Sequence, residues 1–251
     1  MTAPDFSLEG RTAIVTGGSR GIGFAIAAAF IALGARVVIT ARGEEALREA
    51  ERALGPNAIG KVCDNADPEA IARTAAETWA LGPVDVLVNN AGISPYYKPI
   101  EFYTVDEYDS VMDVNLRGTY RWSVEIATRM FEAGRPGSIV NISSVTGTIP
   151  LERVGVYAAS KAGIDQMTRM MALEWANRGV RVNAISPGWT ETDFTDALFS
   201  SRHGEKLLAD IPMGRYARPE DVTGAAVFLA SEASAYVTGA VLLVDGGRSL
   251  R

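Results

Sequence analysis

Cysteine and histidine are almost absent from this sequence of 251 residues, which contains only Cys63 and His203. A single cysteine cannot form a disulfide within the chain, and this fits a reducing compartment such as the cytoplasm. Structural and catalytic zinc sites draw most of their ligands from Cys and His, so we expect no metal site. We expect Cys63, which follows the apolar stretch 58–62, to be a core thiol. We expect His203, within the polar stretch 200–204, to lie in an exposed loop.

Long apolar runs, linkers and excess positive charge are also missing. No uninterrupted apolar run approaches the ~20 residues of a membrane span, and the acidic residues 1–10 lack the apolar centre of a signal peptide. No Gly/Ser-rich or low-complexity segment divides the chain, and 47% of its residues are hydrophobic, which favours one domain over residues 1–251. The net charge of −6 argues against a nucleic-acid partner, because phosphate neutralisation needs clustered Lys and Arg. We therefore expect a cytoplasmic protein that has no nucleic-acid or membrane partner.

Short apolar runs alternate with longer segments that have a helical composition. Near-continuous apolar strands are typical of parallel sheets buried on both faces. Alternation of strand and helix predicts an α/β fold with right-handed crossovers and a doubly wound, seven-stranded parallel sheet covered by helices on both faces. The expected strands are Ala13–Val15, Val37–Ile39, Ala58–Val62, Val84–Val88, Ser138–Ile142, Val180–Ile185 and Val241–Val244, and the clearest helices are Gly21–Leu33, Glu44–Leu54 and Pro68–Ala80.

A glycine-rich turn follows the first expected strand and opens an Ala-rich helix. Gly17, Gly21 and Gly23 supply its glycines, and Ser19, Arg20 and Ile22 lie between them. Glycine lets the backbone approach a pyrophosphate closely, and the helix N-terminus offers free N–H groups and the positive end of a dipole. Such a turn is a weak signal alone, but its place between a strand and a helix is the context that a dinucleotide-binding motif requires.

The residues after the second expected strand bear on the choice of dinucleotide. NAD sites of this type place a carboxylate there to bind the ribose 2′-hydroxyl, but this chain has Ala41 and Arg42. Arg42 and Arg20 suit a 2′-phosphate through charge-assisted bidentate bonds. We therefore expect NADP(H) in preference to NAD(H), with two solvated surface arginines as the alternative interpretation.

Tyr157 and Lys161 lie four residues apart at the start of an amphipathic segment, which places them on one helical face. A phenol has a pKa of about 10, and an adjacent ammonium group lowers it by favouring the phenolate. Tyr157 then suits proton exchange with a carbonyl or alcohol oxygen. The segments 141–144 and 89–92 follow two expected strands, so their polar side chains belong to the sheet edge where ligands bind. A Tyr–Lys pair alone is more often a surface pair.

Together these motifs resemble the short-chain dehydrogenase/reductase family, in the branch with chains of this length. The resemblance runs from about Leu8 to Gly247. It implies a Rossmann-type domain that transfers a hydride between NADP(H) and a ketone or secondary alcohol. It further implies that Ser144 orients the substrate oxygen, Tyr157 transfers the proton, and Lys161 lowers the pKa of Tyr157 and holds the nicotinamide ribose.

The same resemblance assigns supporting roles. Asn115 anchors a water-linked proton relay behind Lys161, and residues 244–247 match a C-terminal signature that supports subunit contacts. Asp64 and Asn65 would face the adenine. The rest of the cofactor would be lined or flanked by Asn89, Ala91, Gly92, Pro187, Gly188, Thr190 and Thr192.

Three segments are candidates for the substrate pocket: 93–98, 145–154 and 189–199. We expect a substrate lid within 189–215. Glu152 and Arg153 are candidates for binding a polar substrate end, although exposed loop charges are usually solvated. The aromatic and apolar wall residues would be Tyr96, Tyr97, Ile149, Leu151, Trp189, Phe194 and Phe199.

Several functions remain open within this resemblance. Members include 3-oxoacyl-carrier-protein reductases, in which a basic residue often precedes the Glu late in the Tyr157 helix; here that residue is Leu173, which weakens this reading. An NAD-dependent sugar or polyol dehydrogenase is the other enzymatic alternative. A cofactor-sensing regulatory protein is a non-enzymatic alternative, but it normally loses Ser144, Tyr157 or Lys161. Epimerases are usually longer, and enoyl reductases place Tyr farther from Lys.

An apolar stripe on the Tyr157 helix bears on assembly. Met167, Met170, Met171 and Trp175 recur at helical spacing. The stripe packs either inside its own subunit or against a symmetry mate. The family resemblance implies the second arrangement together with a C-terminal interface, and two self-complementary surfaces give a closed homotetramer.

Overall fold

Seven parallel strands form one sheet in the computed structural model, which describes residues 3–192, 195, 199 and 202–251. The sheet order is β3-β2-β1-β4-β5-β6-β7, so the chain winds outward in both directions from β1 and β4. The strands are β1 (Thr12–Thr16), β2 (Arg36–Ala41), β3 (Ala58–Val62), β4 (Val86–Asn89), β5 (Gly137–Ile142), β6 (Val180–Pro187) and β7 (Val241–Val244). This arrangement confirms the predicted doubly wound α/β fold.

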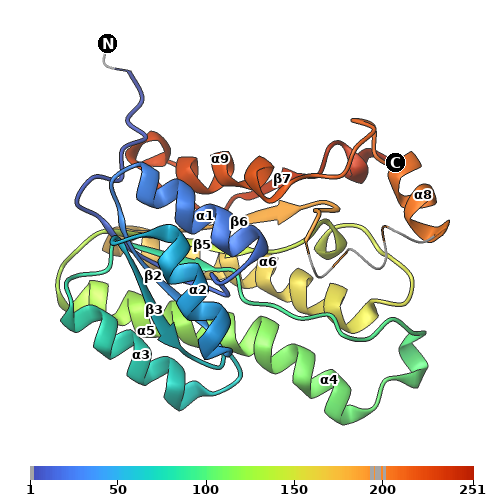
Figure 1. Ribbon diagram of the computed structural model, residues 1–251, viewed down its shortest axis with the longest axis horizontal. Coiled ribbons are helices and arrows are strands. Elements are labelled where there is room, and N and C mark those ends of the chain that lie inside the picture. Colours follow the sequence, from blue (N-terminus) through green and yellow to red (C-terminus); the bar gives the residue numbers. More distant parts are fainter. Residues whose placement is uncertain (1–2, 193–194, 196–198, 200–201) are drawn as a thin grey trace.

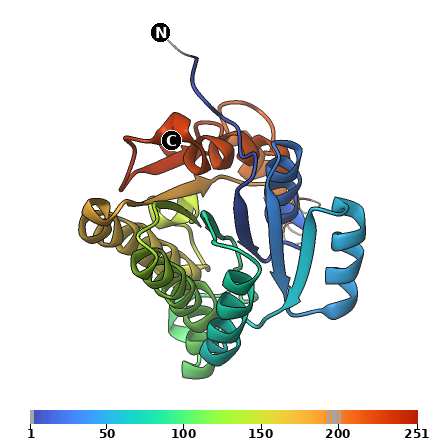
Figure 2. The ribbon, with the colours of Figure 1, turned by 90° about the vertical axis from the view of Figure 1, so that its left-hand side faces the viewer.

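Helices cover both faces of the sheet (Figures 1 and 2). Helices α1, α2 and α9 share one apolar core with the sheet, and α3, α5 and α6 share the other. The described helices are α1 (Gly21–Ala32), α2 (Glu44–Leu54), α3 (Pro68–Ala80), α4 (Val105–Met112), α5 (Gly118–Glu132), α6 (Gly155–Trp175), α8 (Arg202–Ala209) and α9 (Pro219–Ala230). Burial of both sheet faces explains why most strand residues are apolar.

Local sequence signals set the ends of several helices. Asp67 caps α3, because its carboxylate accepts the backbone N–H groups of Glu69 and Ala70, and Pro68 occupies the first turn. Thr104 and Glu107 form a reciprocal capping box at the start of α4. These caps satisfy backbone N–H groups that have no partner inside the helix.

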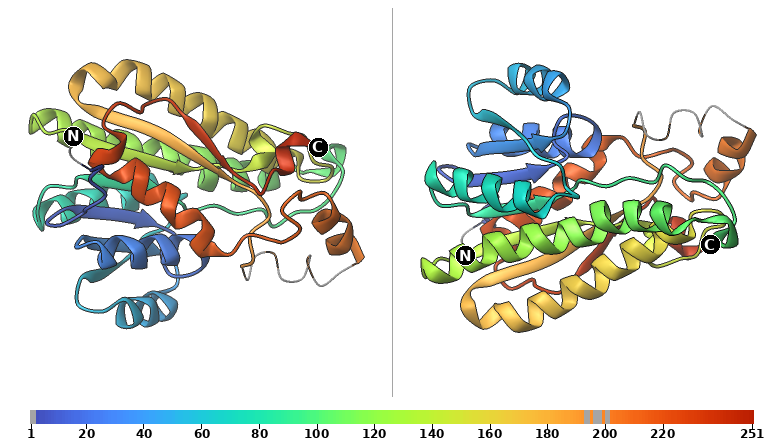
Figure 3. Two further views of the ribbon diagram at one scale, coloured as in Figure 1. Left: turned by 90° about the horizontal axis from the view of Figure 1, so that it is seen from above. Right: turned by 90° about the horizontal axis from the view of Figure 1, so that it is seen from below.

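One irregular turn interrupts a long helical rod. Between α4 and α5 the chain makes a π-helical turn over Asp113–Arg117, and the three segments run on continuously. The right-hand view of Figure 3 shows this rod lying beside α6, and α6 contacts both α4 and the π-helical turn. π-helical turns are rare and frequent at functional sites, and this one contains Asn115.

Two sequence predictions about local structure were wrong. The fourth strand begins at Val86 rather than Val84, because pairing with β1 starts where Val86 lies opposite Ala13. His203 lies in α8 rather than in a loop. Cys63 is buried in the core between the sheet and α3, as expected. Across the described ranges, every helix is too short or too polar to cross a membrane.

Candidate active site

A cleft of about 860 Å³ opens at the edge of the sheet where the parallel strands end. The turns that follow β1, β2, β4, β5 and β6 supply its walls, as open α/β folds predict for a ligand site. Many residues expected from the sequence line it: Gly17, Ser19, Arg20, Gly21, Ile22, Arg42, Asp64, Asn65, Ala91, Gly92, Ser144, Tyr157, Lys161, Pro187, Gly188, Thr190 and Thr192. Segments between Gly17 and Thr195 therefore meet at one surface.

The glycine-rich turn lies at one end of the cleft and is held by Asn90. The amide of Asn90 donates to the carbonyls of Thr16 and Gly17, at 2.9 and 3.0 Å. The hydroxyl of Thr16 in turn accepts the backbone N–H groups of Asn90 and Ala91. Sequence analysis assigned no role to Asn90. Its neighbour Asn89 drew attention instead, and only the fold reveals which amide faces the turn.

Gly23 and Asn89 are not among the residues that line the cleft, and they lie buried next to it. A Cβ atom at Gly23 would lie 2.4 Å from the carbonyl oxygen of Gly17, so this glycine permits close packing of the turn on α1. The amide of Asn89 donates to Ser123 and Asn141, and the residue is only 3% exposed. Both residues support the wall from inside the fold.

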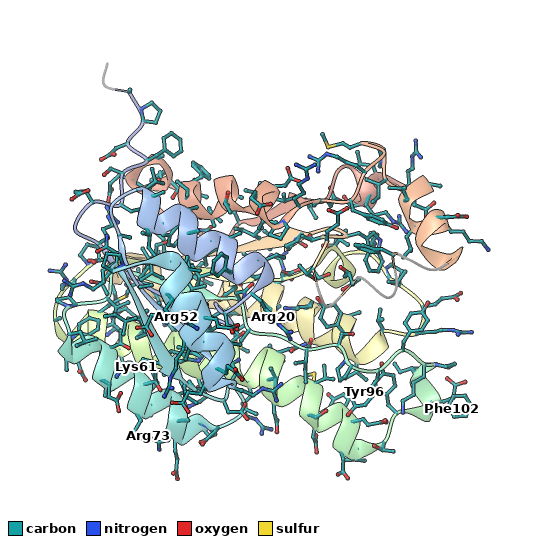
Figure 4. The ribbon with its side chains drawn as sticks, viewed as in Figure 1. Arg20, Arg52, Lys61, Arg73, Tyr96 and Phe102 are labelled. Carbon is teal, nitrogen blue, oxygen red and sulfur yellow. The ribbon has the colours of Figure 1, made fainter. Side chains whose placement is uncertain are left out.

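Two guanidinium groups lie at the end of the cleft near β2. Arg20 and Arg42 are exposed lining residues, and Gly43 and Ala46 complete the wall between them. Figure 4 shows Arg20 beside the start of α1. The lining contributed by residues 40–46 contains no carboxylate. The local charge therefore favours an anionic group at this position.

Asn65 contributes to the wall in a different way from the one expected. Its side-chain amide donates to the carbonyl of Val114 at 2.6 Å, and its oxygen accepts the indole N–H of Trp122 at 2.9 Å. The side chain therefore joins the loop after β3 to the π-helical turn and α5, and Asn65 still lines the cleft. Asp64 is half-buried, and its carboxylate accepts the backbone N–H of Ala66.

Ser144, Tyr157 and Lys161 meet at the other end of the cleft. The hydroxyl oxygen of Ser144 accepts two hydrogen bonds from Thr146, one from its backbone N–H at 3.2 Å and one from its hydroxyl at 3.0 Å. Because a hydroxyl oxygen has two lone pairs, the proton of Ser144 remains free to donate. The Ser144 hydroxyl also acts on Tyr157, whose pKa it lowers. Sequence analysis did not find Thr146, because one more Ser/Thr in a polar stretch carries no signal.

Burial shifts the pKa values of Tyr157 and Lys161, the two ionisable groups at this end of the cleft. It raises the pKa of Tyr157, and the hydrogen bond from Ser144 opposes that rise. Burial also lowers the pKa of Lys161 to about 8, against the opposing charge of Asp165. The ammonium group of Lys161 donates to the carbonyl of Ile142 at 2.8 Å and lies 5.6 Å from the Tyr157 ring centre. Burial is therefore the largest influence on the pKa of Tyr157, and a lowering by Lys161 stays a prediction.

Asn115 lies behind this end of the cleft, in the π-helical turn. Its side-chain oxygen accepts the backbone N–H of Ile93 at 2.8 Å, and its amide donates to the Ile93 carbonyl and to Ser160. A Cβ atom at Gly92 would lie 3.4 Å from both the Asn115 oxygen and the Lys161 nitrogen. Asn115 is fully buried and is not among the residues that line the cleft. The shared distance from Gly92 places it near Lys161.

The walls beyond Tyr157 are aromatic and hydroxylated. Tyr96, Tyr97 and Trp189 line this part, together with Ser94, Thr146 and Val154. Figure 4 shows Tyr96 toward the end of the molecule that carries α8. Ile149, Leu151 and Phe199, also expected here, do not line the cleft, and Phe194 lies outside the described residues. Phe199 instead stacks on Tyr216 with ring centres 3.7 Å apart.

Arg153 and Glu152, the charged candidates for binding a polar substrate end, are exposed and do not line the cleft either. The guanidinium of Arg153 lies over the Tyr97 ring, and its carbonyl accepts the backbone N–H of Lys98. Over residues 3–192, 195, 199 and 204–251, no three His, Cys, Asp or Glu side chains gather as metal ligands would.

A dinucleotide-type turn, a Ser–Tyr–Lys group and a cleft that joins them are the features of a nicotinamide-dependent oxidoreductase. Comparison with known proteins gives the family. A family model described as enoyl-(acyl carrier protein) reductase matches residues 17–249. With that match and close relatives named as dehydrogenases and reductases, the chain belongs to the short-chain dehydrogenase/reductase family and is an oxidoreductase acting on CH–OH and C=O groups.

The individual relatives differ in the substrates that their names give. The D-threitol dehydrogenase of Mycolicibacterium smegmatis is 40% identical over 98% of this chain and 96% of its own. The 3-oxoacyl-[acyl-carrier-protein] reductase of Vibrio cholerae is 41% identical over 96% of this chain and 98% of its own. The gluconate 5-dehydrogenase of Burkholderia cenocepacia, solved with NADP and tartrate, is 35% identical, with a TM-score of 0.93 and coverage of 99% and 98%.

Proposed function

We propose that Tyr157 is the acid/base of a reversible hydride transfer between NADP(H) and a ketone or secondary alcohol. The observation that carries this proposal is the convergence of Ser144, Tyr157 and Lys161 at one end of the cleft. The free proton of Ser144 is available to the substrate oxygen, and the Tyr157 hydroxyl lies beside it. In reduction Tyr157 gives its proton to the oxygen that becomes the alcohol; in oxidation it removes that proton.

The residues present fit a bound dinucleotide. In the described chain no side chain caps α1, so the N–H groups of its first turn remain available to a pyrophosphate. Lys161 would hold the nicotinamide ribose from the floor of the cleft, and Pro187, Gly188, Thr190 and Thr192 would flank the nicotinamide end. The dinucleotide supplies or accepts the hydride when bound. Its oxidised ring is cationic, so together with Lys161 it favours the phenolate of Tyr157.

Asn115 has a supporting role in this proposal. Its position against Lys161 and inside the π-helical turn suits a residue that anchors a proton relay behind the lysine. The side-chain bonds from Asn115 to Ile93 also fix the segment that follows Gly92. Asn115 therefore shapes the wall as well as the relay.

The preference for NADP(H) rests on Arg20 and Arg42. Both guanidinium groups lie at the cleft end where an adenosine ribose would lie, and residues 40–46 bring no carboxylate into the wall. A 2′-phosphate gains charge-assisted hydrogen bonds from such groups. NAD(H) retains every other contact, so its binding is weaker rather than excluded.

We further propose that the substrate is a neutral, hydroxylated ketone or polyol. Beyond Tyr157 the described wall carries hydroxyl and aromatic groups and no charged side chain other than Lys161, which donates to the Ile142 carbonyl and would hold the nicotinamide ribose. Burying a substrate carboxylate without a partner is costly. The D-threitol dehydrogenase among the relatives is named for a neutral polyol. An acyl-carrier substrate finds less support, since Leu173 is 76% exposed where a basic residue would serve an acidic carrier.

A comparison of three carbonyl classes tests this function. NADPH oxidation is followed with L-erythrulose as the neutral ketose, 5-ketogluconate as the sugar acid, and acetoacetyl-coenzyme A as the thioester. We expect kcat/KM for erythrulose to exceed that for 5-ketogluconate by about tenfold or more, because the acid would be buried unpaired. Preference for the acid or the thioester would contradict the substrate class. Turnover of none of a wider ketone panel would contradict the reaction.

Three broader properties complete the proposal. Residues 1–251 act as one dinucleotide-binding domain. The substrate lid lies within residues 189–215, where Trp189 lines the cleft and α8 follows. The protein is a cytoplasmic homotetramer, which the exposed Met170 and Leu173 on α6 and the exposed Leu242 and Leu243 on the edge strand β7 support.

A further inference from the structure

A buried carboxylate lies one helical turn beyond Lys161. Asp165 is only 4% exposed, and its Oδ1 atom is buried without a hydrogen-bond partner among the described residues. Residues four apart on a helix share a face, so Asp165 and Lys161 project from α6 toward the same neighbours. An unpaired buried carboxylate is costly, and the reaction proposed above assigns this one no role.

The loop that carries Ser144 rests on the same carboxylate. A Cβ atom at Gly147 would lie 3.0 Å from Asp165 Oδ2 and 3.0 Å from the carbonyl carbon of Lys161. Only glycine allows the loop to approach α6 this closely. Asp165 is therefore in contact with the segment that begins at Ser144 and lies beside the lysine that acts on Tyr157.

Lys161 needs a counter-charge in this environment. The residue is 3% exposed, and its ammonium group donates to a neutral carbonyl, that of Ile142. Burial disfavours the charged form of an amine. The charge that opposes this effect is that of Asp165.

We propose that Asp165 is a positioning residue of the active site, which stabilises the ammonium form of Lys161 and so acts on Tyr157 through it. The expected effect on catalysis rests on the proposed function. The expected effect of Asp165 on the charge of Lys161 does not. Its physical basis is a buried charge one helical turn from Lys161, inside the protein, where interactions are screened less than in water.

The surroundings of Asp165 contain few other charges. The groups that act on its carboxyl are the hydroxyl of Ser143, which follows β5, and then Arg169 and Lys161, both on α6. The loop after β5 presents the backbone of Gly147. Burial raises the pKa of Asp165, and these three groups oppose the rise. Lys161 is therefore one of three described groups that act on this buried carboxyl.

The direct test is the titration of Lys161 itself. The sequence contains four lysines, at positions 61, 98, 161 and 206, so a protein labelled with ¹³C at lysine Cε gives few NMR signals. The Lys161 signal is assigned by its loss in Lys161→Arg. In Asp165→Asn we expect the pKa of Lys161 to fall by about one unit below the wild-type value, since a stabilising negative charge is removed. Asp165→Glu, which keeps the charge, should restore most of this loss.

Asp85→Asn is the matched control. It also removes a largely buried carboxylate, one that accepts the Thr12 N–H and pairs with Arg135 at the opposite edge of the sheet. We expect it to leave the titration of Lys161 unchanged. An unchanged Lys161 pKa in Asp165→Asn, even with lower activity, would overturn the proposal and leave Asp165 a packing residue. If Asp165→Asn does not fold, Asp165→Ser gives the same comparison.

A kinetic measurement adds the functional consequence. In Asp165→Asn the alkaline limb of kcat/KM for erythrulose reduction should move to lower pH by a similar amount, because Lys161 loses its proton earlier. A uniform fall in rate at every pH would contradict the coupling. A wild type that reduces no ketone, together with a shifted Lys161 pKa in the variant, would contradict the proposed function and leave the Asp165–Lys161 coupling intact.

Discussion

Thr146 holds Ser144 through two hydrogen bonds to one oxygen atom. The backbone N–H and the hydroxyl of Thr146 lie 3.2 and 3.0 Å from the Ser144 Oγ atom. Both acceptor positions of that oxygen are therefore filled by Thr146, and its proton remains available to donate. Ser144 acts as a donor because of the residue two positions after it.

Replacing Thr146 tests this relationship. Thr146→Val keeps the shape and the backbone bond but removes the hydroxyl. We expect kcat to fall about fivefold, which corresponds to one hydrogen bond of ordinary strength, with little change in the Kd for NADPH. Thr148→Val, an exposed residue of the same loop, is the control and should keep the wild-type rate. Equal rates for both variants would show that Ser144 needs no such support.

Tyr157→Phe should abolish turnover while NADPH binding stays largely intact. The substitution removes only the hydroxyl that exchanges the proton, and general acid–base groups contribute about 10²–10⁴-fold to rates. Steady-state kinetics and a fluorescence titration with NADPH measure the two effects separately. If more than about a tenth of the wild-type rate remained, the proton would have another source.

Cofactor preference should change when the charge after β2 is reversed. Ala41→Asp combined with Arg42→Ala supplies a carboxylate for a ribose 2′-hydroxyl and removes a partner of the 2′-phosphate. We expect the ratio of kcat/KM for NADPH to that for NADH to fall by about two orders of magnitude, since charged hydrogen bonds are among the strong ones. Tighter binding of NADH than of NADPH by the wild type would refute the assignment of Arg20 and Arg42.

The start of α9 should respond to acid. The Asp221 carboxylate pairs with Arg215 and accepts the Arg218 N–H, and these contacts lower its pKa to about 2. Because the folded-state pKa lies below the ordinary value, the stabilisation is complete above about pH 4 and is lost as pH falls toward 2. Asp221→Asn should lower Tm by about 2 °C at pH 6, since the pair is partly exposed.

That difference in Tm should close as pH approaches the pKa of Asp221. Thermal melts of both proteins between pH 6 and pH 2.5 measure it. Glu220→Gln, which changes the neighbouring carboxylate of α9, is the control and should show no comparable pH dependence. A Tm difference that stayed constant over this range would mean that Asp221 acts by shape and not by charge.

Substitutions of exposed residues on the outer face of α6 test assembly without altering the core of the subunit. Light scattering at micromolar concentration should give a mass near four times the 26.7 kDa of the chain. Leu173→Lys places a charge on an exposed apolar position and should produce smaller species, since like charges across a two-fold interface repel. Leu81→Lys, on an exposed leucine after α3, should not. An active wild-type monomer would refute the tetramer.

The sequence predicts the strands well because both faces of the sheet are buried. The apolar runs of β1, β2 and β5 must be buried, so their composition alone predicts where these strands lie. The predicted start of β4 was wrong because Val84 is as buried as Val86. A sequence shows that a residue is apolar, but not whether its backbone pairs with a neighbouring strand. His203 shows the opposite case, where a polar stretch that suggested a loop belongs to α8.

The residues of the candidate site also differ in whether the sequence predicts them. Ser144, Tyr157 and Lys161 could be named because their residue types and spacing carry chemistry. Thr146, Asn90 and Asp165 could not, because each acts through a contact that exists only after folding. Asn65 reveals a further limit: a polar residue near a site can be committed to the scaffold, as its bonds to Val114 and Trp122 show.

Helix α6 presents Tyr157 and Lys161 to the cleft and Met170 and Leu173 outward. Inserting or deleting one residue would rotate everything beyond that point by about 100° around the helix axis. Such a change between Tyr157 and Met170 would break the alignment of the two faces. The length of this segment should therefore vary much less than its composition, and insertions should be tolerated in the loops that line the substrate end instead.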